Sequence, residues 1–425
     1  MKVLVVGSGG REHAFVWKLS QSSRVTKIFC APGNAGIARL AKCIDIKADD
    51  VDSLLNFAKY EGIDLTVVGP EAPLTKGITD AFIKEGRMIF GVNASASRLE
   101  GSKVYAKEFM LKYGIPTAEY KSFTSYHQAE EYIRLKGSPA VIKADGLAAG
   151  KGVFVAETAE EAINALNVIM KDKAFGDAGD KVIIEQCLKG EEASFMVLID
   201  GETILPLASS QDHKRIFDND EGPNTGGMGA YSPAPVVTKE LEEEIMASIM
   251  DPIMKGLARE EIKFRGVLYA GLMICDGKPY VLEFNCRFGD PEAQPILMRL
   301  ESDLYDVMKA TAEGRLDQVN LRWKDATSIC VVLSSEGYPG EYAKGRVITG
   351  LDSFKGRDDV FVFHAGTAAN DNGEFITTGG RVLGVTALGS DIKTAKENAY
   401  KAIEKIHFEG MHYRKDIGDR AINRE

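Results

Sequence analysis

The sharpest chemical signal in the sequence is a strand-like segment, residues 279–285, in which Glu283 and Asn285 alternate with apolar residues. Because side chains of a strand alternate between its two faces, both polar groups point the same way. A carboxylate beside an amide oxygen suits Mg²⁺, which needs few protein ligands when phosphates supply the others. Arg287 projects to the same face by the same rule and could hold an anion near the metal. A structural salt-bridge network is the alternative interpretation.

A glycine-rich segment with two lysines, residues 143–152, is a second candidate site for phosphates. It is not a Walker A loop, because three residues rather than four separate Gly146 from Gly150, and a glycine follows Lys151 where Ser or Thr is required. The segment joins two expected strands. We therefore expect a hairpin flap over a polyphosphate, with Lys143 at its base and Lys151 at its tip; a plain surface hairpin is the alternative.

The N-terminal glycine cluster, residues 7–10, follows an apolar run and precedes a helical stretch, as in dinucleotide-binding proteins. Glu12 replaces the third glycine of that fingerprint and obstructs close helix–strand packing, and Cys30 stands near the position of the expected ribose-binding acid. These departures argue against NAD. What remains is a helix N-terminus with Arg11 beside it, which suits a single phosphate.

Two further segments suit a nucleoside and an anion. An apolar run that ends at Glu185 is followed by Glu191 and Glu192, and such a strand edge could hold a base on its main chain and a ribose on a carboxylate, although acids there are more often solvated. Basic residues at 213–215 precede a glycine loop, which suggests a focused anion site in a net-acidic protein. We expect His213 to make a loop hydrogen bond rather than act as a catalytic base.

Composition narrows the class of protein. The 425 residues include 52 Lys plus Arg and 62 Asp plus Glu, a formal net charge of −10. This charge argues against nucleic acid or an anionic membrane as a partner, and no apolar run approaches the ~20 residues of a membrane span. The six cysteines form no CxxC motif, so we expect reduced thiols. The sequence indicates a cytoplasmic, multidomain protein that binds small molecules.

The element pattern predicts a multidomain protein of the α/β and α+β classes. The first hundred residues alternate short, fully apolar runs with amphipathic stretches, which indicates a Rossmann-like parallel sheet covered on both faces. Expected strands are 3–6, 25–30, 65–68, 88–90, 140–143, 152–156, 182–186, 194–199, 203–209, 267–275, 279–285, 328–333, 360–365 and 381–388. Expected helices are 11–19, 51–60, 78–85, 102–114, 159–170, 239–259, 290–312 and 391–407.

The order of these parts resembles the ATP-grasp superfamily, with Lys103 on a helix, Lys143 on a strand, the glycine flap and then the Glu-x-Asn strand. Long motifs spread over essentially the whole chain are similar to the phosphoribosylamine–glycine ligase family. They are GGREHA at 9–14, VGPEAPL at 68–74, KADGLAAGKG at 143–152, SQDHKR at 210–215, GPNTGGMG at 222–229 and EFNCRFGDPE at 283–292. The purine-pathway carboxylases share the fold but lack these sequence motifs.

The resemblance implies four units: an N-terminal Rossmann-like substrate-binding domain (1–101), a first ATP-grasp part (102–192) with a lid at about 117–188, a central catalytic ATP-grasp part (193–325) and a C-terminal mixed α/β domain (326–425). It implies that a monomer uses ATP, with Mg²⁺ or Mn²⁺, to join glycine to 5-phosphoribosylamine through glycyl phosphate, the second step of purine synthesis. Another ATP-grasp ligase or carboxylase, or a non-catalytic nucleotide-binding regulator, is the alternative.

The resemblance also implies a role for each matching residue. The residues implied to bind ATP are Lys103, Lys143, Gly150, Lys151, Glu185, Gln186, Leu188 and Glu192. Those implied to bind phosphoribosylamine are Gly10, Arg11 and Glu71, and those around glycine and its acyl phosphate are Asp212, Lys214, Asn224, Thr225 and Arg287, of which the catalytic ones are Arg287, Asp212 and Lys214. Glu283 and Asn285 are the implied metal ligands. The preceding strand lacks the further acid that many relatives carry, which puts a second metal ion in doubt.

Overall fold

The N-terminal unit is a five-stranded parallel sheet with the strand order β3-β2-β1-β4-β5. The computed structural model describes residues 1–147, 152–354 and 356–424. Leu4 and Val6 of the central strand pack with helices α2 and α4, whereas Val3 and Val5 pack with α1 on the opposite face. The predicted parallel sheet with both faces covered is therefore confirmed. Its elements are β1 (Lys2–Gly7), α1 (Gly10–Leu19), β2 (Lys27–Pro32), β3 (Lys42–Cys43), α2 (Val51–Glu61), β4 (Leu65–Val68), α3 (Glu71–Thr75), α4 (Ile78–Lys84), β5 (Ile89–Phe90) and α5 (Ala94–Gly101).

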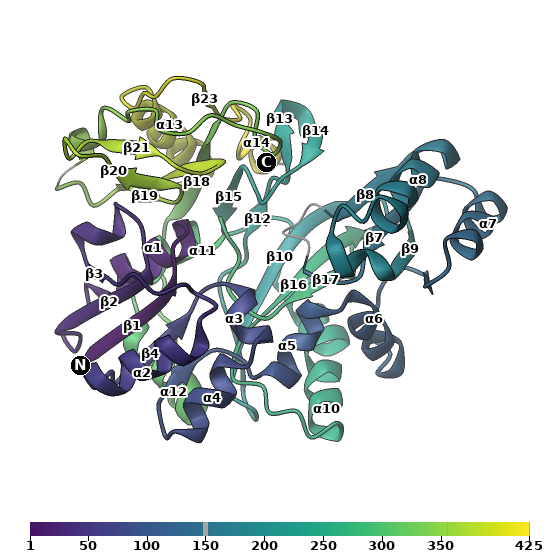
Figure 1. The fold of residues 1–425 in the computed structure, drawn as a ribbon, viewed down its shortest axis with the longest axis horizontal. Helices are drawn as coiled ribbons and strands as arrows, with labels where there is room; N and C mark the ends of the chain where they lie inside the picture. The colour runs from purple at the N-terminus through teal and green to yellow at the C-terminus, as the bar shows by residue number, and fades with distance from the viewer. Residues whose placement is uncertain (148–151, 355, 425) are drawn as a thin grey trace.

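A small antiparallel sheet with its own apolar cluster follows, at the right of Figure 1. Its strand order is β6-β9-β7-β8, and two helices cover it, of which α7 is not among the predicted elements. Helix α6 (Lys103–Lys112) leads into this unit. The elements are β6 (Tyr120–Phe123), α7 (Tyr126–Lys136), β7 (Ala140–Ala144), β8 (Val153–Ala156), α8 (Ala159–Leu166), which continues as a π-helical turn to Lys171, and β9 (Val182–Gln186).

The middle of the molecule is a four-stranded antiparallel sheet, β11-β10-β16-β17. Its strands are β10 (Glu191–Ile199), β11 (Ile204–Pro206), β16 (Gly266–Cys275) and β17 (Lys278–Asn285). Helices α9 (Lys239–Ile245) and α10 (Asp251–Arg259) join through a π-helical turn into the one run that the sequence predicts. The single helix predicted over 290–312 is wrong, because Leu300 is extended and the Asp303 carboxylate caps a new helix. The two helices are α11 (Ala293–Arg299) and α12 (Leu304–Glu313).

The C-terminal sheet combines strands that lie far apart in the sequence, in the order β12-β15-β18-β22-β19, with β23 paired to β18. Two of its strands, β12 (Gln211–Asp212) and β15 (Gly229–Ser232), precede the others by about a hundred residues. This pairing brings Asp212 to the boundary between the middle and C-terminal sheets. The remaining elements are β13 (Arg215–Phe217), β14 (Glu221–Asn224), β18 (Thr327–Ser335), β19 (Val360–His364), β20 (Thr367–Ala369), β21 (Phe375–Thr377), β22 (Arg381–Gly389), α13 (Ile392–Ile403), β23 (Met411–His412) and α14 (Asp419–Ile422).

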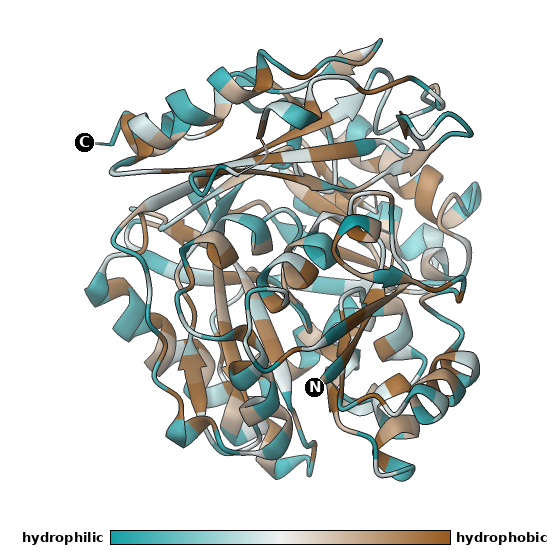
Figure 2. Ribbon diagram, turned by 90° about the vertical axis from the view of Figure 1, so that its left-hand side faces the viewer, coloured by the Kyte–Doolittle hydropathy of each residue, from teal (hydrophilic) through white to brown (hydrophobic). Residues whose placement is uncertain are grey.

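Apolar residues concentrate in the strands, which are mostly brown in Figure 2, while the helices alternate between hydrophilic and hydrophobic faces. This is the pattern expected where helices cover a sheet on one side and meet solvent on the other. All six cysteines are unpaired, as predicted. Within the described ranges, no helix has the length and apolar character needed to cross a membrane.

Candidate active site

A cavity of about 1230 Å³ lies where the N-terminal unit, the small sheet, the middle sheet and the C-terminal segment meet. Of the predicted site residues that the structure describes, all but Gly10 line this cavity. The lining residues are Arg11, Glu71, Lys103, Lys143, Glu185, Gln186, Leu188, Glu192, Asp212, Lys214, Asn224, Thr225, Glu283, Asn285 and Arg287. Gly10 is buried instead, and a side chain there would collide with Gln294. Gly150 and Lys151 lie outside the described residues.

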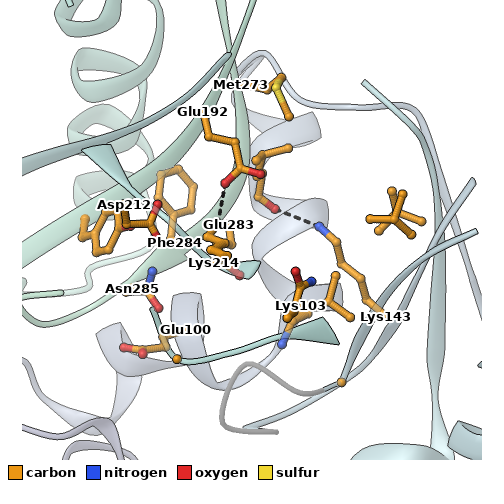
Figure 3. A pocket seen from close by; sticks show the side chains of 18 of the residues that line it. Glu100, Lys103, Lys143, Glu192, Asp212, Lys214, Met273, Glu283, Phe284 and Asn285 are labelled. Carbon is orange, nitrogen blue, oxygen red and sulfur yellow. Dashed lines mark hydrogen bonds and ion pairs between the residues drawn. The ribbon is translucent and has the colours of Figure 1, made fainter. Parts of the chain in front are cut away.

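The predicted metal ligands sit on β17, and both face the cavity (Figure 3). Across the sheet Glu283 pairs with Gly271, where a Cβ atom would lie 3.3 Å from the Glu283 Cγ, so this glycine leaves room for the carboxylate. Burial by itself raises the pKa of Glu283, but Lys214, Lys103 and other nearby cations outweigh it and hold that pKa below its ordinary value. Glu283 is therefore ionised at neutral pH, as a metal ligand must be.

Two predicted lysines approach the cavity from different elements. Lys103, in the first turn of α6, donates to the Gly146 carbonyl oxygen at 3.0 Å, which joins the helix to the base of the glycine segment. Lys143 on β7 donates to a Glu185 carboxylate oxygen at 2.9 Å and to the Leu282 carbonyl oxygen at 3.1 Å. Both lysines lie on the same side of Glu283, with Asn285 on the other side (Figure 3), and both lower the pKa of the Glu283 carboxylate. They supply the local positive charge that a polyphosphate requires.

Glu185 is part of a buried ion-pair network, and its partner Lys107 is a cavity residue that the sequence analysis missed. The Lys107 ammonium lies 3.2 Å from a Glu185 oxygen and donates to the Thr117 hydroxyl at 2.7 Å. Its side chain is only 2% exposed, and burial lowers the pKa of Lys107 to about 8. Lys107 follows Lys103 by one helical turn on α6, and this spacing of four residues is the signal that could have identified it.

Asp212, Lys214 and Glu192 form the most strongly charged part of the wall. The Lys214 ammonium lies 2.8 Å from a Glu192 oxygen. Burial opposes the charge on Lys214, but Glu192, Asp212 and Glu283 together raise its pKa well above the ordinary value. Burial raises the pKa of Asp212 to about 7; Lys214 opposes this, and neighbouring carboxylates such as Glu292 add to it. The Asp212 carboxyl therefore titrates close to neutral pH.

Arg287 connects the metal-ligand pair with the N-terminal unit. Its guanidinium donates to the Asn285 amide oxygen at 3.1 Å and lies 2.9 Å from a Glu100 oxygen and 3.4 Å from a Glu71 oxygen. The shared face that the period-two rule predicts for Asn285 and Arg287 is thus present. Glu100, the last acid of α5, is a contact that the sequence analysis missed.

Arg11 reaches the same cavity from α1. Its guanidinium donates to the Glu12 carboxylate at 2.6 Å and to the Phe288 carbonyl oxygen at 3.0 Å. Glu12 also accepts from the Gly9 N–H at 2.6 Å, and a Cβ atom at Gly69 would lie 2.0 Å from it. The Glu12 side chain therefore packs directly against Gly7, Gly9 and Gly69, in the position where the dinucleotide fingerprint has its third glycine.

The predicted hydrogen bond of His213 is absent. The side chain is buried beside Tyr231, and neither ring nitrogen has a hydrogen-bond partner in the part of the chain that the structure describes. Burial lowers the pKa of His213 to about 3, with nearby arginines acting in the same direction, so the ring stays neutral.

The cavity wall also includes Arg381 and Arg420 from the C-terminal domain, which the sequence analysis missed as site residues. Arg381 lies 2.9 Å from an Asp290 carboxylate oxygen and donates to the Asp290 carbonyl oxygen at 2.7 Å. No periodicity links residues that are ninety positions apart, so local sequence patterns could not reveal this contact.

Lysines from a helix and a strand, a glycine segment between antiparallel strands and a Glu-x-Asn strand around one cavity define an ATP-grasp protein. Profile comparison agrees, because the chain matches the phosphoribosylglycinamide synthetase N domain over residues 1–100, its ATP-grasp (A) domain over 101–293 and its C domain over 328–420. The chain belongs to the phosphoribosylglycinamide synthetase family.

Individual relatives agree with this assignment. The chain is 53% identical to the phosphoribosylamine–glycine ligases of Escherichia coli O157:H7 and of Neisseria meningitidis serogroup B, and each alignment covers all of both chains. A crystal structure of the same ligase from Thermotoga maritima is 34% identical, with a TM-score of 0.84, and covers 98% of this chain and 100% of that chain. The biotin carboxylase domain of Hydrogenobacter thermophilus 2-oxoglutarate carboxylase, 17% identical with a TM-score of 0.75 over 97% of this chain and 91% of that chain, shares the fold alone.

Proposed function

We propose that the protein joins glycine to 5-phosphoribosylamine at the expense of ATP, giving glycinamide ribonucleotide, ADP and phosphate. The observation that carries this proposal is the convergence of phosphate-binding, metal-binding and substrate-binding candidates from all parts of the chain on one cavity. The full-length relatives that carry the name of this ligase support the same reaction.

ATP occupies the side of the cavity formed by α6, β7, β9 and β17. Lys103 and Lys143 contact its phosphates, and the strand end from Glu185 to Leu188 lines the adenine. ATP-binding roles for Gly150 and Lys151 follow from the family resemblance alone, because both lie outside the described residues. Two lysines contact the Glu185 carboxylate, and the Glu185 backbone is paired with Tyr120 and Val141 inside the sheet, so the main chain beyond the strand, at Cys187 and Leu188, contacts the base. Glu192, at the start of β10, contacts the ribose after exchanging its Lys214 partner.

Glu283 and Asn285 hold the divalent metal ion, Mg²⁺ or Mn²⁺. The fit rests on hard oxygen donors side by side on one face of β17 and on the ionised state of the buried Glu283. In the described ranges no group of three or more His, Cys, Asp or Glu side chains is arranged to hold a metal ion, so the nucleotide phosphates supply further ligands. A divalent ion held by these residues would supply positive charge beside the transferred phosphoryl group.

Glycine binds beside Asp212, Lys214, Asn224, Thr225 and Arg287. Its carboxylate attacks the γ-phosphorus of ATP, which breaks the bond to ADP and forms glycyl phosphate. Ionised Asp212 pairs with the glycine ammonium group, while Lys214 and Arg287 neutralise the acyl phosphate. The reaction needs no protein nucleophile.

Phosphoribosylamine binds at the wall contributed by the N-terminal unit, against Arg11 and Glu71, whereas Gly10 is buried and does not reach this wall. Its amine attacks the acyl carbon of glycyl phosphate, phosphate leaves, and the amine loses a proton as the amide forms. Orientation of the two reactants contributes most here, since an aligned intramolecular-like attack can supply roughly 7–11 kcal/mol.

A coupled assay of ADP release tests this function directly. We expect ADP release only when ATP, glycine, freshly prepared phosphoribosylamine and Mg²⁺ or Mn²⁺ are all present, with formation of glycinamide ribonucleotide in equal amount. Glu283→Gln keeps the size of the side chain but removes a ligand charge, and we expect less than a tenth of the wild-type rate at saturating metal. ADP release without glycine, or an active Glu283→Gln variant, would contradict the proposal.

We further propose that the protein acts as a monomer in the cytoplasm. The unpaired cysteines suit a reducing compartment. Sedimentation at assay concentration is expected to give one species near the chain mass of 46.2 kDa.

A further inference from the structure

A two-stranded hairpin, β13–β14, carries three of the proposed glycine-binding residues at its base. Lys214 precedes the first strand, Asn224 ends the second and Thr225 follows it. The Thr225 N–H and hydroxyl both donate to the Lys214 carbonyl oxygen, at 2.8 and 2.7 Å, so the two ends of the hairpin are tied together. All three side chains line the cavity. The position of the hairpin therefore sets the position of these residues.

The hairpin depends on contacts with other segments for its stability. Among the strands of the described residues it pairs with no other, and isolated two-stranded hairpins are marginal in water. Its tip contains two consecutive non-glycine residues in the left-handed region, Asn219 (φ 58°) and Asp220 (φ 56°). Asn and Asp enter this region more readily than other non-glycine residues, but two in succession persist only where surrounding contacts hold them.

The contacts that hold the tip come from the C-terminal segment, residues 412–424. Arg414, 1% exposed, donates to both carboxylate oxygens of Asp416 at 2.7 and 2.6 Å, to Asp220 at 2.9 Å and to the Arg215 carbonyl oxygen at 3.1 Å. Asp416 in turn accepts from the Asn219 N–H at 2.9 Å. Both left-handed residues are thus fixed from a segment almost two hundred positions away.

Arg420 extends this network to the cavity. Its guanidinium pairs with the second Asp220 oxygen, lies 3.5 Å from the Asp212 carbonyl oxygen and lines the cavity wall. The Asp220 carboxylate is therefore shared between a buried arginine and an arginine at the wall. Breaking this arrangement would free the hairpin tip while leaving the ATP side, on α6, β7 and β17, untouched.

We propose that Arg414 and Arg420 are positioning residues that act through Asp220 to hold Lys214, Asn224 and Thr225 in place for glycine. This inference rests on the glycine-binding roles proposed above. It adds a dependence of the site on two arginines near the end of the chain, both of which contact the hairpin through Asp220.

Asp220→Asn tests the inference with little risk to the backbone, because Asn tolerates the left-handed region and only the charge is lost. We expect the KM for glycine to rise at least tenfold and the KM for ATP to change less than twofold. Arg420→Ala, at a partly exposed side chain, should show the same split. A merely structural role would lower the thermal midpoint and the active fraction without separating the two KM values.

Asp419→Asn is the matched control. This neighbour on α14 pairs with Lys396 and makes no side-chain contact with the hairpin in the described structure, so its loss should leave both KM values unchanged. The inference is overturned if Asp220→Asn or Arg420→Ala raises both KM values equally or neither of them. If Asp220→Asn does not fold, the KM values of Arg420→Ala for glycine and ATP decide whether the inference holds. Failure of the proposed function can be distinguished from failure of this inference, because in that case the wild-type protein itself would release no ADP in response to glycine.

Discussion

Replacing Asp212 with asparagine should remove the pH dependence that this buried carboxyl imposes on stability. Burial raises the pKa of Asp212 from an ordinary 3.8 to about 7 in the folded chain, which therefore binds a proton that the unfolded chain has lost. Stability from this group is complete below pH 3.8 and is lost as pH rises to 7. The full loss is about 4 kcal/mol, at about 1.4 kcal/mol per pH unit, and about 3 kcal/mol of it falls above pH 5.

The measurement is urea unfolding of wild type and Asp212→Asn without ligands at pH 5 and pH 8. We expect the free energy of unfolding of the variant, relative to wild type, to rise by up to about 3 kcal/mol between these values, because asparagine does not titrate. Taking the difference between two chains cancels the titration of groups that they share.

Asp391→Asn is the control, because hydrogen bonds with Thr394 lower the pKa of Asp391 and its carboxylate is ionised in both states above pH 5. Its difference from wild type should stay flat between pH 5 and 8. A change of less than about 1 kcal/mol for Asp212→Asn would refute the reasoning, since it would mean that Asp212 is ionised in the free protein. The same raised pKa predicts that glycine binding releases a proton at pH 6, measurable by calorimetry in buffers of different ionisation enthalpy.

Three further changes test other parts of the site. Arg11→Ala should raise the KM for phosphoribosylamine at least tenfold and leave that for ATP nearly unchanged, whereas equal effects in steady-state kinetics would indicate a purely structural arginine. Glu185→Leu leaves Lys107 and Lys143 without their buried partner, and we expect the free energy of unfolding in urea to fall by about 3 kcal/mol or more. A decrease below about 1 kcal/mol would show that water solvates the two ammonium groups in the variant. Gly69→Ala places a methyl group 2.0 Å from the Glu12 carboxylate, so the thermal midpoint should fall by an amount equivalent to about 1–3 kcal/mol, and an unchanged midpoint would mean that Glu12 moves freely.

Local patterns in the sequence were sufficient for much of the fold and for the center of the site. The period of two that places Glu283 and Asn285 on one face depends only on strand geometry, and β17 has that geometry. The apolar runs of the first hundred residues likewise indicate a parallel sheet because both of its faces are buried. The predicted helix over 290–312 failed for a local reason, since the cap at Asp303 was overlooked.

Other features depend on which segments the tertiary structure brings together. Asp220 meets Arg420 across two hundred positions, and Asp290 meets Arg381 across ninety-one. Hydrophobic periodicity in the sequence cannot predict such contacts, because they depend on how whole sheets pack against one another. The raised pKa of Asp212 has the same origin, since it reflects burial and the charges of neighbours from several elements. The sequence by itself determined which chemical groups the chain carries and which face of each element presents them, and packing alone decided which groups share a low-dielectric space and so which charges they hold.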